Sequence, residues 1–145
     1  MTNAPSDPAP APPVIRIAAA VISDAAGRLL LVRKRGTHAF MQAGGKIEPG
    51  ETAAAALRRE LAEELGLAVA AHEPVYLGRR RAPAAHEAGH LVEAELFALR
   101  RDDGMAPAGE IAELRWLDPD ADAACPLAPL TRDHVLPLHR ARTGA

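Results

Sequence analysis

The sequence of 145 residues contains little of what defines several common classes of protein. Its single cysteine, Cys125, excludes an internal disulfide and a zinc site built from several cysteines, and it indicates a reducing compartment. Aromatic residues make up only 3 %, so stacking on a nucleobase would depend on very few side chains. The formal net charge of −2 argues against a nucleic-acid polymer as partner, because such a partner requires a basic surface.

Long apolar runs are also missing from the sequence. No window approaches the roughly 18 consecutive apolar residues that a membrane-spanning helix requires, so we expect no membrane partner. The N-terminus lacks the basic and then apolar pattern of a signal peptide, and we therefore expect a cytoplasmic protein. Residues 1–13 are rich in proline and alanine and are expected to form a disordered arm. Residues 14–145 are expected to form a single domain with its own core.

Glycine and glutamate are instead concentrated in one segment, residues 44–67. Its first seven residues include three glycines and one proline, which let the backbone turn sharply and approach a ligand closely. Strong helix formers follow, with Thr52 as the expected N-cap and Gly66 as the expected C-terminal stop. Leucines recur at every fourth position of this helix and predict a buried stripe formed by Leu57, Leu61 and Leu65.

The same helix carries three carboxylates spaced i, i+3 and i+4, at Glu60, Glu63 and Glu64, so they gather on one face. Such like charges repel one another by ~0.2–0.5 kcal/mol per pair when solvated. Arg59 can reach Glu63 but leaves the other two without a counter-charge. A hard divalent cation, Mg²⁺ in particular, supplies that charge and completes its coordination with water and phosphate oxygens. For the helix taken alone, an ordinary solvated face is the alternative interpretation.

The spacing of the whole segment identifies a known motif. Gly45, five residues, Glu51, seven residues and then RELAEELGL at 59–67 match the Nudix box, G-x5-E-x7-R-E-U-x-E-E-x-G-U, where U is aliphatic. The chain therefore resembles the Nudix hydrolases. The resemblance implies an α/β fold, an α/β/α sandwich with a mixed β-sheet.

The activity that the resemblance implies is hydrolysis of the phosphoanhydride bond in a nucleoside diphosphate-X compound. The substrate would be a small molecule such as a (d)NTP, a damaged nucleotide or a nucleotide sugar like ADP-ribose, and the cofactor Mg²⁺, with Mn²⁺ as a substitute. Two further implications stay open. The chain is alternatively a catalytically silent module that senses or binds nucleotides on the same fold, and it is a candidate homodimer because family members are often dimers.

The resemblance also assigns roles within the box. Glu60 and Glu64 match direct metal ligands, and the backbone carbonyl of Gly44 would be a further ligand. Glu63 matches a residue that binds metal, or that orients or deprotonates the attacking water. Together with Glu64, it belongs to the expected catalytic set.

The remaining members of that catalytic set are Glu51 and Arg59, which match box positions that pair with each other and fix the loop against the helix. Family members often take one more acidic residue from outside the box, as metal ligand or base. Glu110 is the first candidate for this role and Glu87 the second, with Glu87 placed over the substrate. Ordinary surface charge is the alternative for both. Gly45 is expected next to the substrate through its backbone.

Substrate phosphate calls for basic side chains near the box. Arg33 and Arg35 end a predicted strand and share one face of it, so we prefer this pair to Lys34 as phosphate ligands, with a solvated strand end as the alternative. Phe40 precedes the glycine loop and is a candidate for lining the substrate pocket, although packing in the core explains it equally well.

The remaining elements follow from local patterns. A hairpin is expected from two apolar strands around the turn at 24–27. Further strands are expected at about 74–80, 89–100 and near Trp116, with the arginines at 79–81 forming an exposed hairpin tip. The C-terminal segment predicts a closing helix that packs on the sheet and is kinked at Pro137.

Overall fold

The computed structural model describes residues 11–121 and 123–143, so most of the expected arm at 1–13 lies outside the described residues. The elements in chain order are β1 (Val14–Ser23), β2 (Leu29–Lys34), β3 (Ala43–Lys46), α1 (Ala53–Leu65), β4 (Val75–Pro83), β5 (Leu91–Arg100), β6 (Ile111–Leu117), a π-helical turn η1 (Thr131–Val135) and α2 (Leu136–Thr143).

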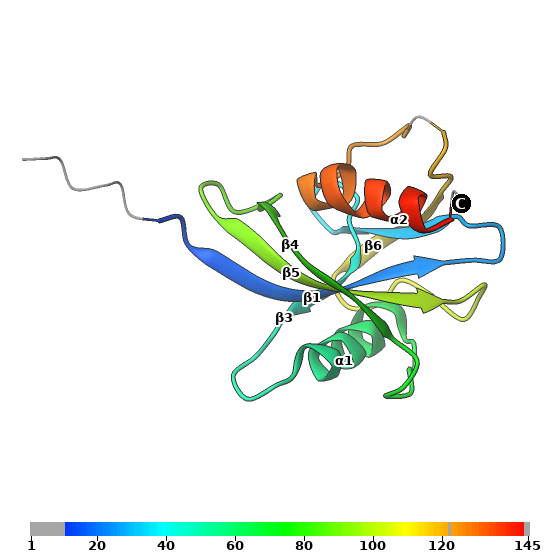
Figure 1. Ribbon diagram of the computed structural model, residues 1–145, viewed down its shortest axis with the longest axis horizontal. Helices are drawn as coiled ribbons and strands as arrows, with labels where there is room; N and C mark the ends of the chain where they lie inside the picture. The colour runs from blue at the N-terminus through cyan, green and yellow to red at the C-terminus, as the bar shows by residue number, and fades with distance from the viewer. Residues whose placement is uncertain (1–10, 122, 144–145) are drawn as a thin grey trace, which may run out of the picture.

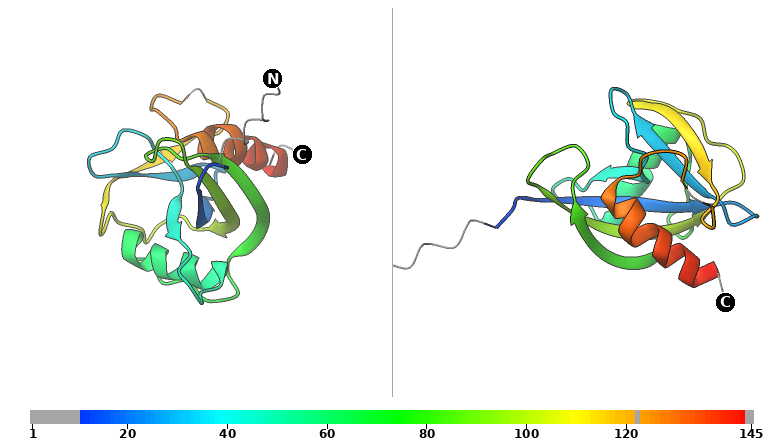
Figure 2. Two further views of the ribbon diagram at one scale, coloured as in Figure 1. Left: turned by 90° about the vertical axis from the view of Figure 1, so that its left-hand side faces the viewer. Right: turned by 90° about the horizontal axis from the view of Figure 1, so that it is seen from above.

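The strands form one mixed sheet in the order β4-β5-β1-β2-β6, with β3 paired to β1 beside that path. Strands β1 and β5 run parallel over ten residue pairs, and the other neighbours are antiparallel. Helix α1 covers one face of the sheet and α2 the other (Figure 1). The left view of Figure 2, turned by 90°, also places the sheet between the two helices. The predicted α/β/α sandwich is therefore confirmed.

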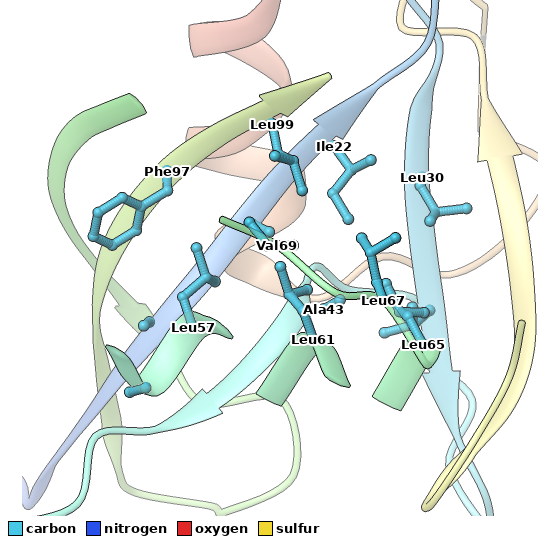
Figure 3. Packing of buried hydrophobic residues seen from close by; sticks show 14 of the residues in the cluster. Ile22, Leu30, Ala43, Leu57, Leu61, Leu65, Leu67, Val69, Phe97 and Leu99 are labelled. Carbon is cyan, nitrogen blue, oxygen red and sulfur yellow. The ribbon is translucent and has the colours of Figure 1, made fainter. Parts of the chain in front are cut away.

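Strand β1 is the centre of both halves of the core, because successive residues of a strand face opposite sides of the sheet. Ala18, Ala20 and Ile22 face α1, whereas Ala19 and Val21 face α2. The predicted leucine stripe of α1 packs against the first group, and its members, each at most 1 % exposed, are Leu57, Leu61 and Leu65 (Figure 3).

Both ends of α1 lie where the sequence predicts them. The hydroxyl of Thr52 accepts a hydrogen bond from the backbone N–H of Ala55 at 3.1 Å, as an N-cap does. Gly66 ends the helix in the left-handed conformation, at φ 62°, where a side chain would be strained. Local sequence therefore fixes the length of this helix, and with it the position of the carboxylates.

The closing helix is interrupted as predicted, in the form of a widened turn. The N–H of Leu136 donates to the carbonyl of Thr131, five residues back, instead of four. Pro137 lacks the N–H for a regular helical bond and its ring crowds the preceding turn, which accounts for the widening. Leu130 and Val135 are buried against the sheet on this side.

The expected hairpin tip at 79–81 is wrong, because β4 extends to Pro83 and keeps these arginines in the strand. Glu93 and Glu95 on the adjacent strand β5 are only 6 % and 5 % exposed. Arg81 bonds Glu93 at 2.8 Å, and Arg79 bonds Glu95 at 2.6 Å. The arginines therefore neutralise two buried carboxylates, and this long-range pairing lengthens the strand. Within the described ranges, no helix is both long and apolar enough to cross a membrane.

Replacing the central leucine of the α1 stripe tests this packing. Leu61→Ala should lower the free energy of unfolding by about 2–5 kcal/mol, because it leaves a cavity in a fully buried site. Leu138→Ala on α2 is the matched control, since Leu138 is only half-buried and its truncation should cost less. Urea denaturation of both variants measures the difference, and equal losses would contradict the packing described.

Candidate active site

Strand β3 brings two glycines between the sheet and α1. A Cβ on Gly44 would overlap with the backbone carbonyl of Ala18 on β1. A Cβ on Gly45 would overlap with the carboxylate of Glu60 on α1. Gly44 therefore has no space for a side chain, whereas a side chain at position 45 would displace the Glu60 carboxylate. The expected loop at 44–50 begins as a strand. This strand forms by pairing with β1, where Gly44 lies opposite Ala19. Local sequence does not report such pairing, so sequence reasoning missed the strand.

Glu64 points from α1 toward β3 and is only 6 % exposed. Its Oε1 accepts a hydrogen bond from the backbone N–H of Gly44 at 2.8 Å. Burial raises the pKa of Glu64 to about 7, against the opposing effects of the Gly44 N–H and the charge of Lys34. The negative charges of Glu60 and Glu110 raise this pKa further, so both carboxylates act electrostatically on Glu64.

Arg59 connects the loop to the helix as the box predicts. Its Nε and Nη2 donate to the two carboxylate oxygens of Glu51 at 2.9 and 2.8 Å, and the pKa of Glu51 falls to about 2 as a result. Arg59 also donates to Glu60 at 2.8 Å and to the carbonyl of Lys46. Glu63 is 3.7 Å away and 58 % exposed. The expectation that Arg59 leaves Glu60 without a counter-charge is therefore wrong.

The donor set around Glu64 consists of hard oxygen atoms, the type that Mg²⁺ prefers. In the present arrangement no three acidic, histidine or cysteine side chains of residues 11–121 and 123–143 are close enough to hold a metal ion. Glu60 is turned toward Arg59, which keeps Glu51 as a second partner if Glu60 moves. A cation beside Glu64 would offset the cost of burying its charge, so the residues fit such an ion.

Two neighbouring depressions adjoin this cluster. The first is polar and is lined by Lys34 and Arg35 at the end of β2, by Glu87 in the β4–β5 loop and by Glu110 before β6. The second is mostly apolar and lies on the α2 side of the sheet, between β1, the start of β5 and η1. Lys34 and Glu87 line both depressions. Both sequence candidates for an acid outside the box therefore lie at the site.

The structure places the basic residues at the end of β2 differently from the prediction. Arg33 donates to the carbonyl of Thr37 at 2.9 Å and lies 3.3 Å from Glu113, and it lines neither depression. The strand register is irregular between positions 33 and 34, where Lys34 turns toward the site. This placement disagrees with the preference for Arg33 over Lys34. Arg35 remains at the site and donates to the carbonyl of Gly109.

Phe40 belongs to the core and not to the lining of either depression. It is 3 % exposed, packs in the cluster below α2, and carries the guanidinium of Arg115 over its ring at 4.8 Å. The alternative of core packing is therefore the correct one. The second, mostly apolar depression is called the apolar cavity below. Sequence reasoning also missed two polar residues that line it, Gln42 and Thr131. The only signal for Gln42 was a polar side chain beside the glycine pair.

Known proteins resemble this chain in sequence and in fold. A family model described as NUDIX domain matches residues 13–138. The CTP pyrophosphohydrolase of Escherichia coli (strain K12) is 32 % identical over 122 residues, which are 80 % of this chain and 84 % of the relative. The solution structure of the E. coli ORF135 protein superposes with a TM-score of 0.65 at 27 % identity and covers 91 % of this chain and 90 % of that one.

A more distant structure shows the same fold. The MutT protein from Methanosarcina mazei Go1 has a TM-score of 0.69 at 19 % identity, over 92 % of this chain and 95 % of that protein. Together with the complete box, these matches mean that the chain belongs to the Nudix hydrolases, pyrophosphohydrolases that act on nucleoside diphosphate derivatives and generally use divalent metal ions.

Proposed function

We propose that the protein hydrolyses a nucleoside triphosphate to the monophosphate and pyrophosphate in a Mg²⁺-dependent reaction. The observation that carries this proposal is the buried Glu64, whose pKa responds to the charges of Glu60, Glu110 and Lys34, the last two of which line the polar depression. Such a cluster suits a divalent cation together with an anionic substrate. The E. coli relative, which is named for its action on CTP, supports a nucleoside triphosphate among the substrates that the family accepts.

The cation is assigned to Glu60, Glu64 and the carbonyl of Gly44, with Glu110 and Glu63 as neighbouring oxygen donors. When bound, it neutralises phosphate charge and lowers the pKa of a coordinated water. Glu60 would leave Arg59 to take part, while the bidentate bond between Arg59 and Glu51 keeps the loop attached to α1.

The protein's own side chains supply the remaining functions. Lys34 and Arg35 line the polar depression and are proposed to hold the phosphates, whose negative charge hinders attack by water. Glu63 is 58 % exposed at the end of the carboxylate face, so we assign it the orientation of the attacking water. Glu87 borders both depressions and is proposed to contact the substrate where the phosphates meet the nucleoside.

Removing the charge of the buried carboxylate tests the catalytic assignment. Glu64→Gln should lower kcat by roughly 10²–10⁴-fold, because a metal contact is worth several kcal/mol in the transition state. The assay uses CTP, UTP, ATP and GTP with Mg²⁺ and measures released phosphate and pyrophosphate separately. Glu73→Gln is the control. Glu73 lies in the segment before β4, pairs with Arg101 after β5 and lines neither depression.

The results separate the alternatives clearly. Pyrophosphate release by the wild type that is lost only in Glu64→Gln supports the proposal. Unchanged turnover in Glu64→Gln would contradict the role of that carboxylate. Nucleotide binding without turnover by the wild type would identify a catalytically silent binding module instead.

The two glycines of β3 provide a second test with a built-in control. Gly45→Ala should keep the stability of the wild type but lose at least tenfold in kcat, because the new Cβ displaces only the end of the Glu60 side chain. Gly44→Ala should instead lower the free energy of unfolding by about 2 kcal/mol or more, since its Cβ meets rigid backbone at φ 148°. Urea denaturation and the pyrophosphate assay measure both variants. A fully active Gly45→Ala would contradict the role of Glu60.

A further inference from the structure

The apolar cavity on the α2 side of the sheet contains a polar side chain that the hydrolytic chemistry does not use. Ile15 and Ile17 of β1, together with Val92 of β5, supply apolar lining. Gln42 lies in this lining just before β3 and is only 6 % exposed. Thr131 of η1 is fully buried beside it. The cavity therefore places an amide among hydrocarbon side chains.

Only the oxygen of this amide has a hydrogen-bond partner. The hydroxyl of Thr131 donates to Oε1 of Gln42 at 2.6 Å, which fixes the side chain in one orientation. Nε2 of Gln42 is buried and has no hydrogen-bond partner in the described part of the chain. A buried donor without a partner destabilises a folded protein, and native structures keep few of them. Because Gln42 lines the cavity, a molecule bound there that reaches its amide would supply the missing partner.

The position of the cavity indicates what that molecule is. Lys34 and Glu87 line both the apolar cavity and the polar depression that contains Glu110, so one ligand can occupy both. A nucleotide has the matching division, with charged phosphates at one end and a flat heterocycle at the other. Apolar walls with a few fixed polar groups are the usual environment for such a heterocycle.

We infer that Gln42 is a specificity-determining residue, whose Nε2 donates to a hydrogen-bond acceptor of the nucleobase, a carbonyl oxygen or an unprotonated ring nitrogen. This inference rests on the proposed function and extends it to the base. Thr131 acts as a positioning residue, because its hydroxyl occupies the amide oxygen and leaves Nε2 as the unpaired end of the amide. Discrimination follows, since a base that presents a donor at this point leaves two donors facing each other.

Two substitutions remove the donor in different ways. Gln42→Met keeps the approximate length of the side chain, and Gln42→Glu also keeps an acceptor for the hydroxyl of Thr131. Isothermal titration with the α,β-methylene analogues of CTP, UTP, ATP and GTP measures binding without turnover. Both variants should bind the preferred nucleotide about tenfold more weakly than the wild type. Ribose 5′-triphosphate, which lacks a base, should bind all three proteins equally.

The wild-type protein allows an independent test, because Gln42 is the only glutamine in the sequence and Asn3 the only asparagine. A ¹⁵N–¹H correlation spectrum therefore contains just two side-chain amide pairs, and Gln42→Met identifies one of them. The preferred nucleotide analogue should shift the Gln42 pair, whereas ribose 5′-triphosphate should leave it in place. This readout holds even if a variant folds poorly.

The outcomes distinguish this inference from the proposed function. Hydrolysis of nucleotides with unchanged affinities in both variants and an unmoved Gln42 signal would overturn the inference alone. A shifted Gln42 signal and weaker binding in the variants, without any turnover by the wild type, would support base recognition and overturn the hydrolytic proposal. Failure of the wild type to bind any of the analogues would overturn both.

Discussion

The hydrogen bond from the Gly44 N–H to the buried carboxylate of Glu64 is the contact on which the site depends. It forms because two residues without side chains let β3 lie between β1 and α1. The leucine stripe packs α1 against the sheet in one cluster with Ala43 of β3, and Glu64, on the adjoining part of the helix surface, is thereby directed toward β3. Packing in the core and the burial of Glu64 are thus parts of one arrangement, and the raised pKa of Glu64 is its electrostatic consequence.

The two depressions beside this arrangement differ in the polarity of their lining. Polar and charged residues gather where β2, the β4–β5 loop and the start of β6 meet, next to Glu64. Apolar residues of β1 and β5 line the cavity on the other side, where Gln42 and Thr131 are the polar exceptions. The strand end that carries Lys34 joins the two. In the proposed function, these two regions would hold the phosphates and the nucleoside.

Much of the fold could be predicted because it depends on local interactions. The caps at Thr52 and Gly66 and the leucine spacing are set within a few turns of the helix, and they fix where the box carboxylates lie along it. The strand character of β3 could not be predicted, since two adjacent glycines favour a loop and only pairing with β1 makes them a strand. The directions in which the side chains of Arg33 and Lys34 point depend on an irregularity in the pairing of β2 with β6. The cavity around Gln42 joins segments distant in sequence, which local patterns do not report.

The central claim is that Glu64 is a buried carboxylate that binds a cation. The pH dependence of the free energy of unfolding, measured with and without Mg²⁺, tests this claim. Its pKa rises from 4.5 to about 7 on folding, so the neutral form is favoured and its stabilising effect is complete below pH 4.5. Without metal, as pH rises through 7, the wild type should lose on the order of 3 kcal/mol relative to Glu64→Gln. At pH 8, Mg²⁺ should restore stability to the wild type and not to Glu64→Gln. Equal pH profiles for the two proteins, or no effect of Mg²⁺ on the wild type, would contradict the account.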